Sequence, residues 1–257
     1  MPCNKVTFLP EQVHARPLTF GTGRFNVWGG GPNELLTRTH AVLSAYNPGE
    51  EGGNALWSII TGERSPEGKL TVSWPQSAAH LHSTHSPWMT LRQGSGSEQP
   101  YSFATQWALF PIGHGLSFTS FVYSNLVVAA TPSASRSDAV WNDSSFGDSV
   151  SYTVSVTVTN NGTMAGAETV LFLHSLWVSQ VVRWQRQLSG FAKVRLQPGQ
   201  SAIARATFGS EELAVWLNLP GASRWWTEPG NYSIQACSSV VDCRLNATFM
   251  VGNTVGT

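Results

Sequence analysis

Residues 150–159, near the middle of the chain, alternate strictly between apolar and polar side chains, with Val154, Val156 and Val158 among the apolar ones. Successive side chains of a β-strand point to opposite faces, so this pattern predicts a strand with one buried face and one solvent-facing face. Asn160, Asn161 and Gly162 come next and predict a turn that ends the strand. The alternation therefore constrains this part of the chain to β-structure.

Further strands are predicted on both sides of this one by short apolar runs separated by turn signals. They cover residues 121–129, 168–174, 190–196, 202–208, 231–236 and 244–251. Pro198-Gly199 and Pro229-Gly230 supply two of the intervening turns. About seven strands at this spacing predict two packed sheets. We therefore expect residues 118–253 to form an all-β sandwich of the immunoglobulin or fibronectin type III kind.

The chain before the sandwich has a different pattern. An apolar run over residues 41–46 leads through a Pro-Gly turn into a segment with apolar residues at helical spacing, which Gly62 is placed to end in a left-handed turn. A short strand is expected over residues 70–75, followed by a polar connector to about residue 108. One strand and one helix cannot bury a core. Residues 39–117 are therefore interpreted as the remnant of an α/β sandwich domain plus a connector, which makes the fold class mixed.

Residues 1–38 show little periodicity, and we expect them to be irregular. Gly21-x-Gly23 is not a dinucleotide-binding fingerprint, because no third glycine, preceding strand or following helix supports it. No segment reaches the roughly 18 apolar residues of a spanning helix, and the N-terminal residues do not resemble an export signal. Because features typical of glycosylated proteins occur further along, we expect the authentic N-terminus to lie upstream.

The charge of the chain excludes some partners. The formal net charge is zero and only 12% of the residues are charged. A chain with so little net positive charge offers no electrostatic attraction for a phosphate backbone or an acidic membrane surface. Neither nucleic acid nor a membrane is an expected partner.

Two kinds of covalent modification are suggested by residue spacing. Possible N-glycosylation sequons begin at Asn142, Asn161, Asn231 and Asn246, and they favour a secretory route, although Ser- and Thr-rich strands also produce sequons by chance.

The second modification is a disulfide. Cys237 and Cys243 flank a five-residue turn and could bridge a hairpin, which would leave Cys3 unpaired. Strand parity argues against the bridge, because Cys237 shares a face with Gln235 whereas Cys243 shares one with Leu245. The sequence leaves this disulfide open.

No catalytic constellation is found. A sugar hydrolase uses two carboxylic acids on opposite sides of one glycosidic bond. Glu50 and Glu51 are adjacent, so in an extended loop they point to opposite sides and cannot both face one bond. Glu211 and Glu212 are also adjacent and are excluded for the same reason. A nucleophile elbow and a phosphate-binding loop are also missing from the sequence. No catalytic residue is assigned.

A metal or cofactor site is not expected either. His80, His82 and His85 have spacings that metal ligands use, but no Cys, Asp or Glu lies nearby until Glu98. A solvated loop is the favoured interpretation of these histidines.

Motifs spread over residues 40–252 resemble the C-terminal portion of glycoside hydrolase family 3. They are Pro-Gly-Glu-Glu-Gly-Gly-Asn-Ala-Leu from residue 48, Thr-Gly-Glu-Arg-Ser-Pro-Glu-Gly-Lys-Leu from residue 61, and Phe-Pro-Ile-Gly-His-Gly-Leu-Ser-Phe from residue 110. The strand over residues 154–162, Leu-Ser-Gly-Phe at 188–191 and Leu-Gln-Pro-Gly-Gln at 196–200 continue the resemblance. Thr71, Cys237 and Cys243 depart from the usual family pattern.

The resemblance implies a parent β-glucosidase or β-xylosidase that hydrolyses β-linked sugars from chain ends with retention, as part of carbohydrate metabolism. Its parts would be a barrel, an α/β sandwich domain and a fibronectin type III-like domain. The family's catalytic Asp and Glu lie in motifs that have no counterpart here, so this chain alone is expected to be an inactive fragment. The alternative is a non-catalytic module that binds carbohydrate or protein through Trp177, Trp184, Trp225 or Trp226.

Overall fold

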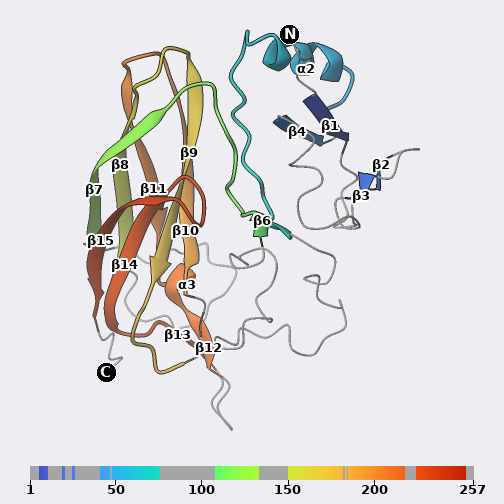
Figure 1. The fold of residues 1–257 in the computed structure, drawn as a ribbon. Helices are drawn as coiled ribbons and strands as arrows, with labels where there is room; N and C mark the ends of the chain where they lie inside the picture. Colours follow the sequence, from blue (N-terminus) through green and yellow to red (C-terminus); the bar gives the residue numbers. More distant parts are fainter. Residues whose placement is uncertain are drawn as a thin grey trace.

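The computed structural model describes residues 6–10, 19–20, 25–26, 41–46, 48–75, 108–132, 150–181, 183, 185–217 and 224–252. Within these ranges the elements are, in chain order, β1 (Val6–Pro10), β2 (Thr19–Phe20), β3 (Phe25–Asn26), β4 (Ala41–Tyr46), α2 (Gly52–Ile60), β5 (Trp74–Pro75), β6 (Ala108–Phe110), β7 (Phe121–Pro132), β8 (Val150–Asn160), β9 (Gly166–Ser175), β10 (Gln187–Leu196), β11 (Ser201–Phe208), α3 (Ser210–Leu213), β12 (Val215–Leu217), β13 (Arg224–Trp226), β14 (Gly230–Cys237) and β15 (Cys243–Val251) (Figure 1).

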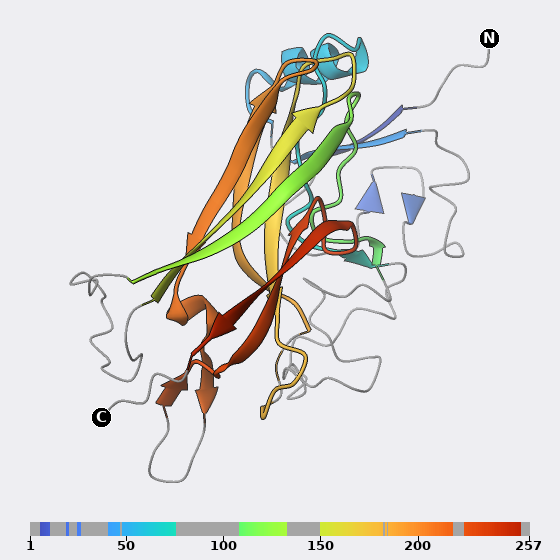
Figure 2. The same cartoon turned by 90° about the vertical axis from the view of Figure 1, so that its left-hand side faces the viewer.

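Two antiparallel sheets form the sandwich. One has the strand order β11-β8-β7 and the other the order β10-β9-β14-β15. Figures 1 and 2 show their long strands running side by side, with α3, β12 and β13 gathered at one end. Each of the seven strands predicted from the sequence is present, and the structure extends each by at least one residue. The predicted fold class, an α/β remnant followed by an all-β sandwich, is confirmed.

The core of the sandwich is built by the alternation that defines β8. Val154, Val156 and Val158 are fully buried, while the Ser and Thr residues between them face the other way. The opposing sheet contributes Phe172 and Tyr232, which belong to the same buried cluster. Burying a Val side chain contributes about 1.5–3 kcal/mol, so this one strand carries a substantial part of the stability of the sandwich.

Asn160 explains why β8 ends where it does. Its side-chain Nδ2 donates to the backbone oxygens of Met164 (2.8 Å) and Leu196 (3.1 Å), and its Oδ1 accepts from Thr119 Oγ1 (2.6 Å). The backbone N–H of Gly162 also donates to Oδ1, at 3.1 Å. A buried amide satisfied in this way fixes the turn after the strand.

The N-terminal elements make a much smaller unit. β1 pairs with β4 in parallel and β2 with β3 antiparallel, so the prediction that residues 1–38 are irregular is wrong for the three short strands β1, β2 and β3. A strand of five residues is too short to show a clear period, and its partner lies some 35 positions away in the chain. The predicted strand over residues 70–75 is also corrected, because the strand in this range is Trp74–Pro75 alone, although Leu70 makes two isolated backbone hydrogen bonds.

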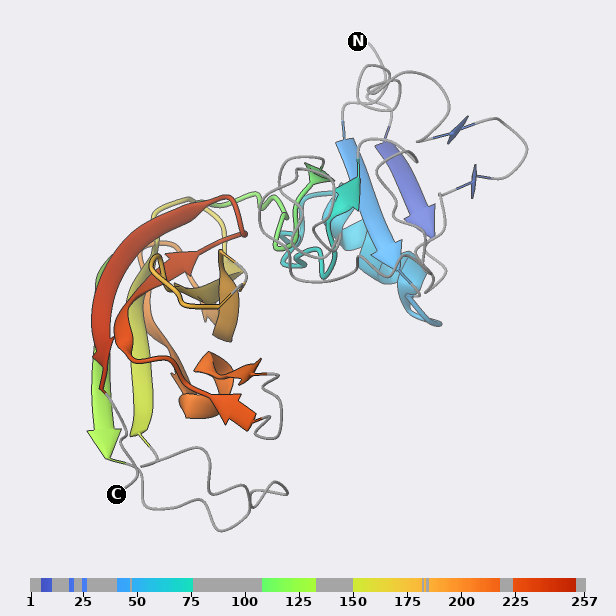
Figure 3. The same cartoon turned by 90° about the horizontal axis from the view of Figure 1, so that it is seen from below.

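Helix α2 follows β4 as predicted and ends at Ile60, and Gly62 shortly after it has the expected left-handed conformation, with a φ of 77°. Gly52 is its only buried residue. Figure 3 shows the unit of β1, β4 and α2 beside the sandwich, joined to it by the segments around β5 and β6. No helix in the described part of the chain is long and apolar enough to cross a bilayer.

Candidate functional site

Two buried carboxylates, Glu168 and Glu228, are the strongest candidates for chemistry among the described residues. Glu168 lies near the start of β9, and its Oε1 accepts from the Tyr123 hydroxyl at 2.7 Å. Lys69 Nζ lies 3.5 Å from the other carboxylate oxygen. Burial, and secondly the charge of Glu168, raise the pKa of the Tyr123 phenol, which therefore remains a hydrogen-bond donor.

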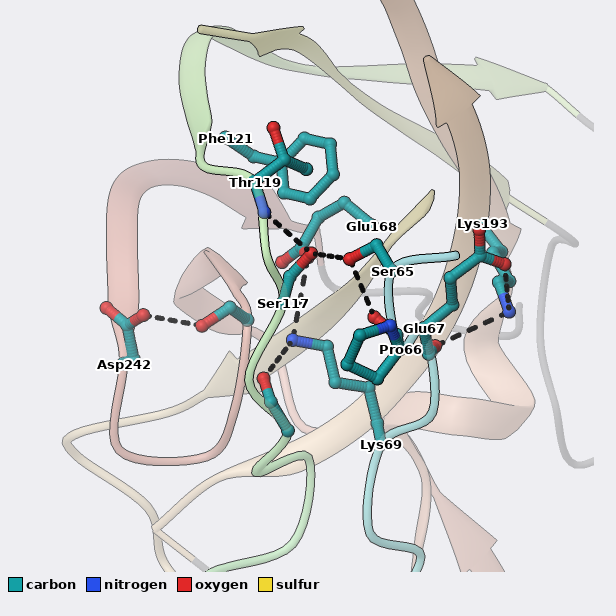
Figure 4. Close-up of polar contacts among 12 residues, drawn as sticks. Ser65, Pro66, Glu67, Lys69, Ser117, Thr119, Phe121, Glu168, Lys193 and Asp242 are labelled. Carbon is teal, nitrogen blue, oxygen red and sulfur yellow. Dashed lines mark hydrogen bonds and ion pairs between the residues drawn. The ribbon is translucent and has the colours of Figure 1, made fainter. Parts of the chain in front are cut away.

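The residues around Glu168 belong to a contact that we call the joint, formed by the segments 65–70 and 111–120 against the sandwich. The hydroxyl oxygens of Ser65 and Ser117 are 2.7 Å apart, and Figure 4 shows the two side chains pointing toward each other. Ser65 Oγ also accepts from the backbone N–H of Phe118 at 2.9 Å. Both serines are held by protein groups, which favours a structural role over nucleophilic catalysis.

Backbone pairing and an ion pair complete the joint. Leu70 N–H donates to His114 O at 2.9 Å, and Gly113 N–H donates to Leu70 O at 2.7 Å. Glu67 accepts from Arg195 on β10 at 2.7 Å (Figure 4 shows the same carboxylate beside Lys193). The joint therefore fastens the segment after α2 to the outer face of β10 and to β9. The polar groups of the joint therefore hold this segment in position.

Glu228, at the other end of the sandwich, also has a structural role, because it accepts hydrogen bonds from neighbouring protein groups. It accepts from Arg183 (3.1 Å), Ser179 Oγ (2.6 Å) and the backbone N–H of Gln180 (2.6 Å). The Arg183 and Glu228 side chains are only 4% and 3% exposed. A buried ion pair with this many hydrogen bonds holds the loop after β9 in place.

The two buried carboxylates cannot serve one glycosidic bond. Glu168 lies near the start of β9, whereas Glu228 binds residues that follow the end of that strand, at Ser179 and Gln180. The rise of a strand separates them by roughly 20 Å. Glycosidases hold their two carboxylic groups about 5–9.5 Å apart. Neither group can pair with the other as acid and nucleophile.

The acidic residues singled out in the sequence are not brought together either. Glu50 and Glu51 are exposed at the start of α2, where Asn54 Nδ2 donates to Glu51 Oε2 at 2.6 Å. Glu211 and Glu212 lie in α3, and Glu212 accepts from the backbone N–H of Gly209 at 2.7 Å. The Gly209–Glu212 bond caps the start of α3, whereas the Asn54–Glu51 bond joins two exposed side chains at the start of α2.

Three of the four sequons can be placed. Asn161, Asn231 and Asn246 are exposed, and Asn142 lies outside the described residues. Asn161 Oδ1 accepts from Ser120 Oγ at 2.8 Å. His80, His82 and His85 also lie outside the described ranges, and within those ranges no group of three His, Cys, Asp or Glu side chains is arranged to hold a metal ion.

A disulfide joins Cys237 and Cys243 in the structure. The parity argument against this bond assumed an unbroken strand pair. The structure instead has a register shift between Ala236 and Cys237, which brings the two cysteines opposite each other. A β-bulge of this kind cannot be read from alternation alone.

The exposed aromatic residues gather partly on one hairpin. Trp216 and Trp225 face each other across β12 and β13, with ring centroids 5.4 Å apart, and are 52% and 40% exposed. Trp177 is 87% exposed, Trp226 is half-buried, and Trp184 lies outside the described residues. Sequence reasoning missed Trp216, although the Pro220-Gly221 dipeptide between Trp216 and Trp225 in the sequence was a usable hairpin signal.

Sequence reasoning also missed the joint. Glu168 is the only acidic residue in an otherwise mainly apolar strand, and this pattern indicates a buried carboxylate that needs a partner. The sequence gives no local sign that the partners are Tyr123 and Lys69, which are separated from Glu168 by 45 and 99 positions.

Comparisons with known proteins agree with this arrangement. Residues 26–118 match the profile of the glycosyl hydrolase family 3 C-terminal domain, and residues 168–240 match that of a fibronectin type III-like domain. A probable beta-glucosidase I of Aspergillus terreus is 32% identical over 231 residues, covering 84% of this chain and 25% of that protein. Beta-glucosidase B of Emericella nidulans is 31% identical over 229 residues, covering 80% and 24%.

Solved structures of similar proteins share the fold. A beta-glucosidase from Streptomyces venezuelae, solved with D-glucose, has a TM-score of 0.63 at 30% identity, over 85% of this chain and 27% of that one. A beta-glucosidase from Erythrobacter marinus has a TM-score of 0.66 at 27% identity, over 95% and 28%. The chain spans about a quarter of the length of the curated relatives it matches.

Proposed function

Because the chain belongs to glycoside hydrolase family 3, we propose that it supplies the C-terminal part of a β-glucosidase that releases sugar from the ends of β-linked glucosides. The observation that carries this proposal is the joint, which fixes the segment after α2 against the sandwich as one positioned unit. The relatives named above are beta-glucosidases, which favours glucosides over xylosides as substrates. Residues 39–117 and 118–253 are the two domains of this proposal.

A chimera tests this role. The matching C-terminal quarter of the Aspergillus terreus relative is replaced by residues 41–252 of this chain, and hydrolysis of aryl β-glucoside and β-xyloside is measured. We expect activity on the glucoside at least about tenfold above that of the relative truncated at the same point, a difference of about 1.4 kcal/mol in transition-state stabilisation. A soluble, folded chimera no more active than the truncated protein would contradict the proposal.

We also propose that the 257-residue chain alone is inactive. Its two buried carboxylates are roughly 20 Å apart, and both accept hydrogen bonds from other protein groups. The purified chain should show no turnover of aryl β-glucosides or β-xylosides above buffer. Hydrolysis that co-purifies with the chain and disappears in a Glu168→Gln or Glu228→Gln variant would overturn this.

A second candidate function is carbohydrate binding without catalysis, favoured by the exposed Trp216–Trp225 pair. Indole faces stack on the apolar faces of sugar rings. Cello- and xylo-oligosaccharides should then quench Trp fluorescence in the wild-type chain and not in a Trp216→Ala/Trp225→Ala variant. No response at millimolar sugar would remove this candidate.

The sequons support a secretory route for the protein. Asn161, Asn231 and Asn246 are exposed and therefore compatible with attached glycans. Expression in yeast behind a secretion leader should give a product that becomes lighter after endoglycosidase treatment. The Asn161→Gln, Asn231→Gln and Asn246→Gln variants then identify the modified sites, and a product unchanged by the enzyme would count against glycosylation.

A further inference from the structure

The turn between β14 and β15, residues 238–242, has three buried residues although it connects two strands, and only Val241 and Asp242 in it are exposed. Val240, in the middle of this turn, is only 2% exposed, and Ser238 and Ser239 are also buried. Ser238 N–H donates to Asp242 O at 2.9 Å, which closes the turn, and the Cys237–Cys243 disulfide lies at its base. Turns usually face solvent, so a buried turn must be covered by another part of the protein.

The cover is the segment after β6. Val240 N–H donates to Ile112 O at 3.1 Å, and Ile112 packs against the cluster of Leu173, Cys237 and Val240. The neighbouring Gly113 has a φ of 81°, and a Cβ there would lie 2.7 Å from Ser239 Cα. This cluster shares no residue with the main core of the sandwich. It is a separate contact, to which the turn with its flanking cysteines, strand β9 through Leu171 and Leu173, and Ile112 all contribute.

We propose that the Cys237–Cys243 disulfide is a redox-sensitive clasp that holds the turn in the shape that receives Ile112 and Gly113, and so positions the segment preceding the sandwich. A dithiol reductant would break the S–S bond, give two cysteine thiols and itself become a cyclic disulfide. Cys237 is fully buried and Cys243 is half-buried, so attack at Cys243 is favoured. The six-residue separation closes only a small ring, which constrains the unfolded chain less than a long loop would. The effect of the bond is therefore local. This proposal does not depend on the glycosidase activity.

Hydrogen exchange on the full chain tests the clasp. Intact mass should first show the unreduced protein lighter by two hydrogens than the fully reduced one. On addition of dithiothreitol, the amides of Val240 and Gly113 should exchange about tenfold faster or more, while those of Val154 and Val156 in β8 stay unchanged. The Cys237→Ser/Cys243→Ser variant should behave like the reduced protein, and Cys3→Ser like the wild type.

Two glycine variants distinguish local loosening of the turn from a general loss of stability. Gly113→Ala should speed exchange at Val240 with the disulfide intact, because the new Cβ meets Ser239 Cα. Gly199→Ala is the matched control, since Gly199 has a similar φ of 76° but nothing within 4 Å of an added Cβ. More than one free thiol per chain in the unreduced protein (Cys3 accounts for one), unchanged exchange at Val240 on reduction, or equal acceleration in β8 would each overturn the proposal.

Discussion

Strand β8 and helix α2 both have a clear amphipathic sequence pattern, but of the two only β8 has its apolar face fully buried. Val154, Val156 and Val158 are fully covered by the opposite sheet, whereas Trp57 and Ile60 on α2 remain 65% and 44% exposed. The difference lies in the partner surface, because β8 meets a four-stranded sheet whereas α2 has the two-stranded sheet of β1 and β4 beside it among the described residues (Figure 3). An apolar face stabilises a fold only where the chain supplies its counterpart.

The largest effect is expected when the same charge is placed on each of these faces. Val156→Asp would bury an unpaired carboxylate in the sandwich core and should destabilise it by more than about 4 kcal/mol. Ile60→Asp, on the partly exposed face of α2, should cost less than about 1 kcal/mol. Urea denaturation followed by circular dichroism measures both. Similar costs at the two positions would break the comparison.

The buried ion pair should give the next largest effect. Arg183→Met leaves the Glu228 carboxylate without its cation and should destabilise the sandwich by about 3–5 kcal/mol. Adding Glu228→Gln should recover part of this loss, because the buried charge is then removed. Arg195→Met is the matched control, since Arg195 is 69% exposed in its pair with Glu67 and should cost less than about 1 kcal/mol.

Acid should weaken the sandwich through His174. Burial, and secondly the charge of Arg183, lower its pKa to about 4. In the unfolded chain His174 becomes protonated near pH 6.5, whereas in the folded protein it stays neutral down to about pH 4. The stabilisation from the neutral side chain is therefore fully present above pH 6.5, and about 3 kcal/mol of it is lost as the pH falls toward 4. A His174→Gln variant should lose this slope in the free energy of unfolding between pH 6.5 and 4. A slope equal to that of the wild type would show that other groups cause it.

The same contrast explains which parts of the fold could be predicted. In the sandwich, local alternation and turn residues agree with the final packing, so the run from Val150 to Val158 located its strand to within two residues. In β1 the signal was too short, and its pairing with β4 depends on residues far along the chain. A local sequence pattern therefore identifies an element when that pattern also determines which of its side chains are buried.

The site was less predictable because its contacts are non-local. Lys69, Tyr123 and Glu168 meet only after the sandwich and the segment after α2 have come together. The Cys237–Cys243 pairing depends on one register shift, which reversed the parity argument. The sequence could show that the chain lacks a recognisable catalytic pair, but it could not show what its buried carboxylates do instead.

The smallest effect on folding is expected on the exposed face of α2, where association is the better measurement. A Trp57→Ser/Ile60→Ser variant should change the free energy of unfolding by no more than about 0.5 kcal/mol. It should nevertheless shift the chain toward monomer in sedimentation velocity, because exposed apolar patches promote association. Ile203→Ser is the control, since Ile203 is 59% exposed on β11 of the sandwich. If Ile203→Ser reduces association as much as the helix variant does, the uncovered face of α2 is not the cause, and the contrast with β8 concerns stability alone.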